Sequence, residues 1–151
     1  MRVAVAALLL AVVFSGQATP RQPAEDAEML HKRLLVLDTH LDTPMHFGRP
    51  GWDFGARHDP ADDIVQVDLA RMEAGALDGG FFAIYTDQGP LTPEGYAAAL
   101  AFARKRSDLI DTTLAGFPTR IAPARTADDA RRLNRANTLI AFKSMENSYP
   151  V

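Results

Sequence analysis

Two patterns of apolar and polar residues alternate along the chain. Continuous apolar runs of strand length predict three β-strands, over residues 34–39, 77–85 and 138–146. Apolar residues at helical spacing predict four helices, over residues 25–33, 69–74, 93–114 and 126–135. This alternation of strands and helices predicts an α/β fold with a parallel sheet.

Residues at the helix starts support these assignments. Asp68 and Thr92 precede their helices as N-caps, and Pro93 follows Thr92 at the first helical position. Thr126 and Asp129 form the pattern of a capping box. In the longest helix, the inward stripe is predicted to comprise Tyr96, Leu100, Ala103, Ser107, Ile110 and Leu114.

The connections between the strands restrict the architecture. Crossovers between parallel strands are nearly always right-handed, which leaves an open doubly wound sheet or a (β/α)8 barrel. Both architectures bind their ligands at the carboxyl ends of the strands. Candidate chemistry is therefore expected where the predicted strands end.

The N-terminus has the pattern of a cleavable export signal over residues 1–18. Arg2 precedes twelve apolar residues, 3–14, and residues 16–18 resemble a signal-peptidase site. Twelve helical residues span about 18 Å, which is short for a bilayer core of about 30 Å. We expect a secreted or periplasmic protein, with residues 19–33 as a tether and short helix; the alternative is an uncleaved anchor or a buried first helix.

Composition excludes several classes of function. The 151 residues are 47% apolar and 23% charged, with a net charge of −3, and the charges are scattered. Such a chain is typical of a globular domain and argues against nucleic-acid binding; it leaves the export signal as its only membrane feature. The absence of cysteine excludes disulfides and thiolate metal sites, so any metal must be held by histidine and carboxylate groups.

His40 and Asp42 follow the first apolar run as His-x-Asp. Alternate residues of a strand share a face, about 7 Å apart, so this pair can form half of a divalent-metal site. Glu146 ends the third predicted strand and is expected at the same edge of the sheet. The alternative interpretation is a hydrogen-bonded histidine and a turn-forming aspartate.

A long irregular loop covers residues 45–63. Loops of this length are often lids or binding loops, and Trp52 and Phe54 could then form apolar walls of a site. The alternative is a packed surface loop whose aromatic residues fill a small core of their own. We expect His46 and His58 to be solvated or to contact a metal ligand, rather than to bind a metal themselves.

Three segments, LDTHLDTP (37–44), QVDLARMEAG (66–75) and SMENSYP (144–150), resemble the membrane (renal) dipeptidase family of the amidohydrolase superfamily in order and spacing. The resemblance implies a zinc-dependent (β/α)8 barrel that hydrolyses dipeptides and can be a homodimer. It implies that His40 and Asp42 bind one of two Zn²⁺ ions, and that Glu146 is a catalytic carboxylate bridging both. The attacking group would be a hydroxide between the ions. Asp38 would support His40 or cap a neighbouring backbone group.

The third predicted strand lies at the end of the sequence. We therefore expect residues 34–151 to form the N-terminal portion, about three β/α units, of a truncated barrel that is inactive alone. Lys143 departs from the pattern, because it alternates away from Glu146 into a position where an apolar residue is expected. Two alternatives remain open: another metal-dependent amidohydrolase, and a non-catalytic secreted α/β binding module.

Overall fold

The computed structural model describes residues 27–151. Its elements in chain order are α1 (Ala27–Lys32), β1 (Leu37–Leu41), the 3₁₀ helix η1 (Thr43–His46), α2 (Leu69–Ala74), β2 (Gly79–Ile84), α3 (Pro93–Ala115), β3 (Ile121–Pro123), α4 (Ala127–Arg135) and β4 (Leu139–Met145). The predicted signal peptide, and the tether up to residue 26, lie outside the described residues. Within residues 27–151, no helix has the length and hydropathy needed to cross a bilayer.

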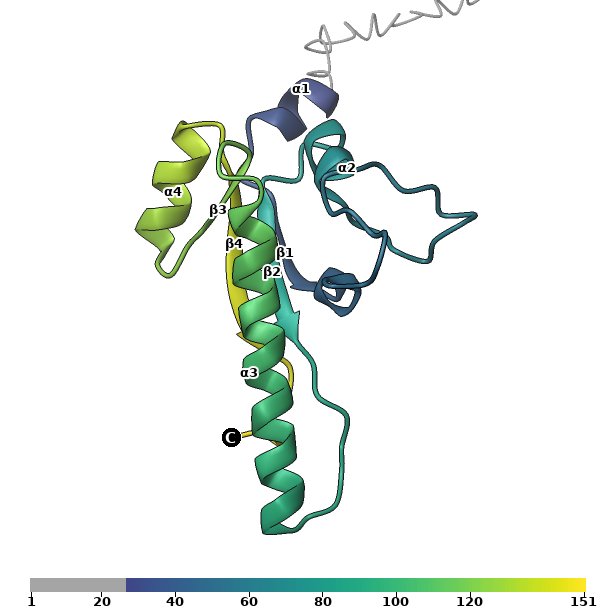
Figure 1. The fold of residues 1–151 in the computed structure, drawn as a ribbon. Coiled ribbons are helices and arrows are strands. Elements are labelled where there is room, and N and C mark those ends of the chain that lie inside the picture. The colour runs from purple at the N-terminus through teal and green to yellow at the C-terminus, as the bar shows by residue number, and fades with distance from the viewer. Residues whose placement is uncertain (1–26) are drawn as a thin grey trace, which may run out of the picture.

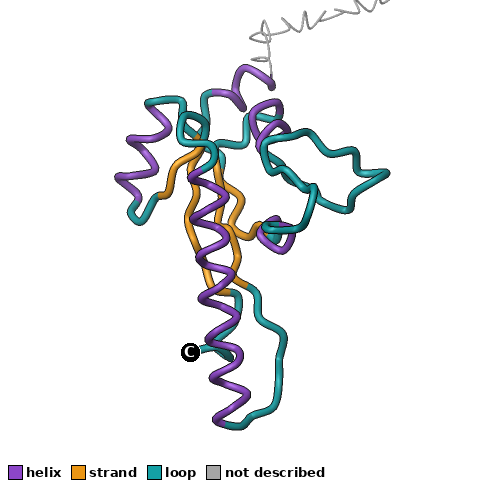
Figure 2. The backbone as a smooth tube through the Cα atoms, viewed as in Figure 1, coloured by secondary structure: helices purple, strands orange, loops and turns teal. Residues whose placement is uncertain are grey.

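The four strands form one parallel sheet in the order β1-β2-β4-β3 (Figures 1 and 2). The predicted α/β class and parallel sheet are therefore correct, but the number of strands was one too few. The missing strand is β3, which pairs only with residues 139–141 of β4. It has three residues and ends in Pro123, so its sequence has the composition of a loop.

One face of the sheet carries the main core. Phe82 of β2 and Ala141 of β4 point to this face, where they pack with Ile110 and Leu114 of α3, which lies along the strands in Figure 1. Burial of these apolar side chains is the principal force that holds α3 on the sheet.

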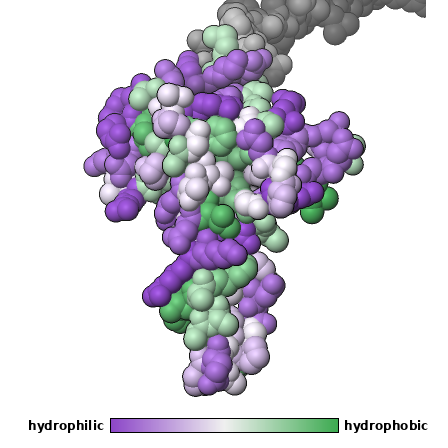
Figure 3. All heavy atoms as spheres, viewed as in Figure 1, coloured by the Kyte–Doolittle hydropathy of each residue, from purple (hydrophilic) through white to green (hydrophobic). Residues whose placement is uncertain are grey.

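The first turns of α3 extend beyond the strands, so the first part of the predicted inward stripe does not face the sheet. Tyr96 is 44% exposed, whereas Ala103, Ile110 and Leu114 are buried as predicted. Figure 3 shows hydrophobic side chains on this half of the helix, where Phe102 is also exposed.

The opposite face is covered at the start of the strands by α4. Ala130 and Leu133 of α4 pack on Ile140, whose side chain points away from that of its neighbour Ala141. The predicted capping box of α4 is present, with Thr126 and Asp129 exchanging hydrogen bonds. Further along the same face, the rings of Phe81 and Phe142 stack with their centroids 4.7 Å apart.

The first strand begins later than predicted. Leu34 and Leu35 are 52% and 43% exposed and precede β1, which starts at Leu37. Among residues 27–151, β1 pairs only with β2, and Leu34 and Leu35 lie before its first residue, outside the sheet.

Lys143 points to the face that α3 covers, as its alternation predicts. Its ammonium group lies 2.8 Å from Oδ2 of Asp111 and donates a hydrogen bond to Oγ of Ser107 at 2.9 Å. Both partners belong to α3. The positive charge of Lys143, which the sequence pattern left unexplained, is thus paired with Asp111 of α3. The aliphatic part of the lysine side chain covers apolar surface.

Candidate metal centre

A bulge in β1 directs His40 away from the main core. Asp38 pairs with Gly80 and Leu41 pairs with Phe82, so two residues of β1 lie opposite one residue of β2. Leu41 can then be buried on the face of Phe82 while His40 is displayed on the other face. Oδ1 of Asp38 accepts a hydrogen bond from the backbone N–H of His40 at 2.8 Å, which stabilises the bulge. Of the two roles considered for Asp38, the structure shows the backbone cap.

Asp42 follows β1 at the start of η1. It occupies the N-cap position, and its carbonyl accepts the first helical hydrogen bond from Met45. Its side chain makes no capping bond, so the carboxylate is available to face His40. Arg106 of α3 holds η1 in place by donating to the carbonyl of Pro44 at 2.9 Å.

Glu146 comes from the end of β4, two strands away from His40 in the sheet. Its backbone N–H donates to the carbonyl of Ile84 at 3.2 Å, which continues the β2–β4 ladder past Met145. Glu146 therefore leaves the sheet at the same edge as His40 and Asp42. This edge is formed by the carboxyl ends of parallel strands, where both barrels and open α/β sheets bind ligands.

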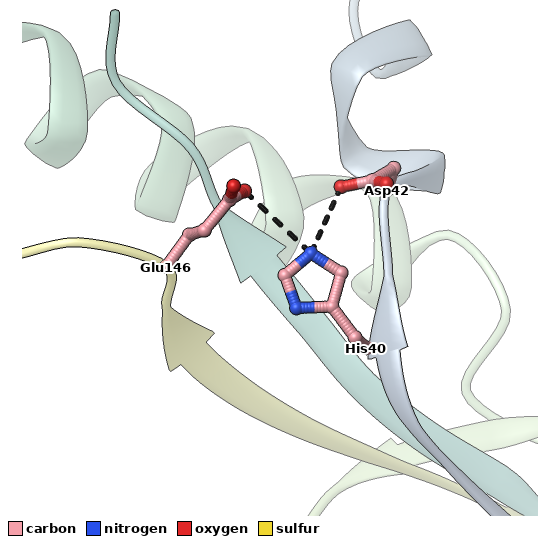
Figure 4. Close-up of side chains that lie close together, drawn as sticks. All are labelled: His40, Asp42 and Glu146. Atoms are coloured by element: carbon pink, nitrogen blue, oxygen red, sulfur yellow. Dashed lines mark hydrogen bonds and ion pairs between the residues drawn. The ribbon is translucent and has the colours of Figure 1, made fainter. Parts of the chain in front are cut away.

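The three predicted residues meet at this edge (Figure 4). Nε2 of His40 lies 3.1 Å from Oδ1 of Asp42 and 3.5 Å from Oε2 of Glu146. One potential ligand atom from each residue lies within 4.8 Å of the other two. The side chains are 45%, 62% and 36% exposed in the order His40, Asp42, Glu146, so solvent and a ligand can reach them.

The donor set fits a divalent cation. Two carboxylates repel each other at this separation, and a single imidazole nitrogen can donate only one proton, to one of them. A cation among the three groups would offset the charge and satisfy every donor atom. One nitrogen and two carboxylate ligands match a catalytic zinc site, which takes three protein ligands, although other divalent ions use the same donors.

The long loop packs into the core. Phe54 is 2% exposed and its ring contacts those of Phe47 and Phe82, so its role as a wall of the site was a wrong expectation. Trp52 stacks on His58 with centroids 4.8 Å apart. Among the described residues the group of potential metal ligands is His40, Asp42 and Glu146, whereas the His58 side chain is only 16% exposed against Trp52.

Tyr85 is a residue at this edge that the sequence reasoning did not single out. It directly follows β2, and its hydroxyl donates to Oδ1 of Asp87 at 2.9 Å. This hydrogen bond raises the pKa of Tyr85, and the negative charge of Glu146 adds to the effect. The alternation along β2 was the available signal, because Phe81, Ala83 and Tyr85 share the face on which Glu146 lies.

Comparisons with known proteins indicate one family. The family profile described as membrane dipeptidase (peptidase family M19) matches residues 24–151. A search of curated proteins found no match.

Three solved structures resemble the fold. The probable dipeptidase PvdM from Pseudomonas aeruginosa is 28% identical with a TM-score of 0.68, over 82% of this chain and 30% of that chain. A metallo peptidase of family M19, dipeptidase AC, is 25% identical with a TM-score of 0.62, over 78% and 36%. A metallo peptidase from Rhodobacter sphaeroides, solved with a phosphinate mimic of L-Ala-D-Ala, is 20% identical with a TM-score of 0.59, over 78% and 39%.

The chain thus spans about a third of the length of these solved structures. They have a TIM-barrel-like fold. This similarity confirms the predicted fold class, in which the parallel sheet and its helices belong to a barrel.

Proposed function

Because the chain belongs to the membrane dipeptidase family of metallopeptidases, we propose that its three converging side chains bind zinc and serve the hydrolysis of dipeptides. The observation that carries the proposal is the meeting of His40, Asp42 and Glu146, whose potential ligand atoms lie within 4.8 Å of one another. The sequence separation of Glu146 from the other two makes this meeting a property of the fold, since it depends on the pairing of β4 with β2.

Each residue has a distinct part in this proposal. His40 offers Nε2, and its backbone bond to Asp38 holds the strand segment that aims the ring. Asp42 and Glu146 offer carboxylate oxygens that offset the charge of a bound cation. Bound zinc would supply Lewis-acid activation of the peptide carbonyl and of water. Glu146, the least exposed of the three, offers two carboxylate oxygens to a bound cation.

The number of ligands sets the expected stoichiometry. The described residues bring together three ligand groups, the number that a single catalytic zinc takes from a protein. The two ions that the family resemblance implies would share too few ligands here. We therefore propose that the purified chain binds one zinc ion and turns over dipeptides slowly or not at all.

Zinc binding by wild type and Glu146→Gln tests the proposal. Zinc per chain is measured by mass spectrometry after dialysis, affinity by competition with a chelating dye, and hydrolysis with Ala-Ala and L-Ala-D-Ala. Glu94→Gln is the matched control, because it makes the same substitution in the first turn of α3, outside the proposed site. We expect one zinc ion per chain in the wild type and in the control. In Glu146→Gln we expect the zinc affinity to be about tenfold weaker.

Three outcomes would contradict the proposal. An unchanged zinc affinity in Glu146→Gln would indicate that the three residues are structural, as in a non-catalytic binding module. Rapid dipeptide turnover by the chain would contradict the argument from ligand number. Hydrolysis of other amides or esters in preference to dipeptides would point to a different amidohydrolase.

We also propose that the protein is exported and that the complete enzyme is a homodimer. Export follows from the pattern of residues 1–18, and the homodimer follows from the family resemblance alone. Cell fractionation with N-terminal sequencing tests export, since cleavage after residue 18 is expected. Analytical ultracentrifugation tests the dimer.

A further inference from the structure

The position of Tyr85 beside Glu146 follows from the pairing of β2 with β4. Ala83 pairs with Ser144 and Ile84 with Met145, so the next step of the ladder places Tyr85 opposite Glu146. Side chains at such paired positions touch on this face, as the stacked rings of Phe81 and Phe142 show. In Figure 4, β2 runs between the strands that carry His40 and Glu146, and its chain continues past them.

Two hydrogen bonds hold this step of the ladder together. The backbone N–H of Glu146 donates to the carbonyl of Ile84 at 3.2 Å, and Nδ2 of Asn147 donates to the carbonyl of Thr86 at 3.0 Å. One bond lies just before Tyr85 and the other just after it. The segments that leave β2 and β4 are thereby kept side by side beyond the last strand residues.

The hydroxyl of Tyr85 donates a hydrogen bond to Oδ1 of Asp87 at 2.9 Å, which fixes the orientation of the half-buried ring at the end of β2. Within residues 27–151, the only close polar partner of the Glu146 carboxylate is His40. A partly exposed glutamate side chain with one polar contact can adopt many rotamers. Neighbouring side chains must restrict these rotamers if the carboxylate is to stay in the conformation that binds a metal.

We propose that Tyr85 is a positioning residue for Glu146. Its ring restricts the side-chain conformations of Glu146 and keeps the carboxylate directed at His40 and Asp42, while Asp87 holds the ring through the hydroxyl. The inference rests on the proposed metal-binding role of Glu146. It adds a residue from the central strand to a site whose ligands all come from β1 and β4.

Zinc affinities of five variants, one of them Glu146→Gln, test this role, measured by dye competition on the full chain. We expect Tyr85→Ala to weaken zinc binding about tenfold, the usual effect of losing a group that orients a ligand. Tyr85→Phe keeps the ring and should stay within about threefold of wild type. Tyr96→Ala is the matched control, because it removes a tyrosine ring from the projecting end of α3 and should change nothing. In the Glu146→Gln background, Tyr85→Ala should cost less than about twofold, since an effect exerted through Glu146 cannot persist without it.

The outcomes separate the possible failures. If Glu146→Gln leaves the affinity unchanged, the metal-site proposal itself is wrong. If Glu146→Gln weakens binding but Tyr85→Ala does not, only the role of Tyr85 is wrong. An equal loss in Tyr85→Phe and Tyr85→Ala, or an equal loss with and without Glu146, also overturns it. Should Tyr85→Ala unfold, judged by circular dichroism, Tyr85→Leu replaces it with the same expected loss.

Discussion

Nε2 of His40 lies 3.5 Å from Oε2 of Glu146, so side chains from the first and last strands meet across β2. Neither side chain is buried, and no apolar packing forces the contact. It results from two backbone features, the bulge that displays His40 and the extra ladder bond that holds Glu146. The fold thus gathers three polar side chains at a solvent-accessible edge of the sheet, where a cation can reach them.

Zinc should stabilise the folded chain through this cluster. A ligand at about 100 times its dissociation constant adds about 2.7 kcal/mol to the free energy of unfolding, which corresponds to a rise of several degrees in melting temperature. Asp42→Asn should abolish most of this rise, because the amide is a weaker zinc ligand than the carboxylate. Differential scanning fluorimetry with and without zinc measures the effect. Asp128→Asn is the control, since Asp128 is 93% exposed on α4; a loss of the shift there would point to non-specific binding.

Gly79 lets β2 approach β4 closely enough to carry Glu146 to the site. A Cβ atom at Gly79 would overlap the carbonyl oxygen of Ile140 and lie 2.6 Å from its Cβ. Gly79→Ala should therefore separate the strands, lower the free energy of unfolding by about 3 kcal/mol and weaken zinc binding. Gly51→Ala is the comparison: its φ of +75° is strained for alanine, but no atom lies within 4 Å, so a loss of about 1–2 kcal/mol with normal zinc affinity is expected. Urea unfolding and dye competition measure both quantities, and equal effects in the two variants would contradict the close-approach argument.

The convergence and the helix caps that the sequence predicted depend on features common to parallel sheets or on a few neighbouring residues. His40, Asp42 and Glu146 could be placed together because parallel strands end at one edge of a sheet, whatever their detailed pairing. The N-caps Asp68, Thr92 and Thr126 were also correct, since a cap depends on only three or four neighbouring residues.

The missed features depend on which strand lies beside which. The β1 bulge arises from the register of Asp38 and Leu41 against β2, and the exposure of Leu34 follows from its position before β1, outside the sheet. The partner of Lys143 could not be found from the strand alone, because Asp111 is brought to it by the packing of α3. Phe54 was misplaced for the same reason, since a loop pattern does not show which face of a sheet it covers.

The ion pair between Lys143 and Asp111 should contribute little to stability. Their side chains are 35% and 56% exposed, and pairs exposed to this extent are worth about 0–1 kcal/mol. We expect Lys143→Met to unfold within about 1 kcal/mol of wild type, because methionine can cover the same apolar surface as the lysine stem. A double-mutant cycle with Asp111→Ala, followed by urea unfolding, gives the coupling energy. A coupling well above 1 kcal/mol would show that the pair is effectively buried.

The carboxylate of Asp68 should make the stability of the protein depend on pH in the acid range. Asp68 is fully buried at the start of α2, where burial raises the pKa of its carboxyl group. Hydrogen bonds from the backbone N–H groups of His58 and Arg71, together with the Arg71 guanidinium, outweigh burial and leave the pKa below its usual range. The unfolded chain thus binds this proton more readily than the folded one.

The resulting stability is fully present above the unfolded pKa of about 4, and it is lost as the pH falls through the lower folded value. Asp68→Asn cannot titrate, so the free energy of unfolding should fall less steeply between about pH 4 and pH 2 than in wild type, from a starting value about 1–3 kcal/mol lower. Thr92→Ala is the control, because it removes an N-cap without a titrating group and should shift the whole curve down by about 1 kcal/mol at constant shape. Urea unfolding at a series of pH values measures the slopes. Parallel curves for wild type and Asp68→Asn would exclude Asp68 as a source of the acid sensitivity.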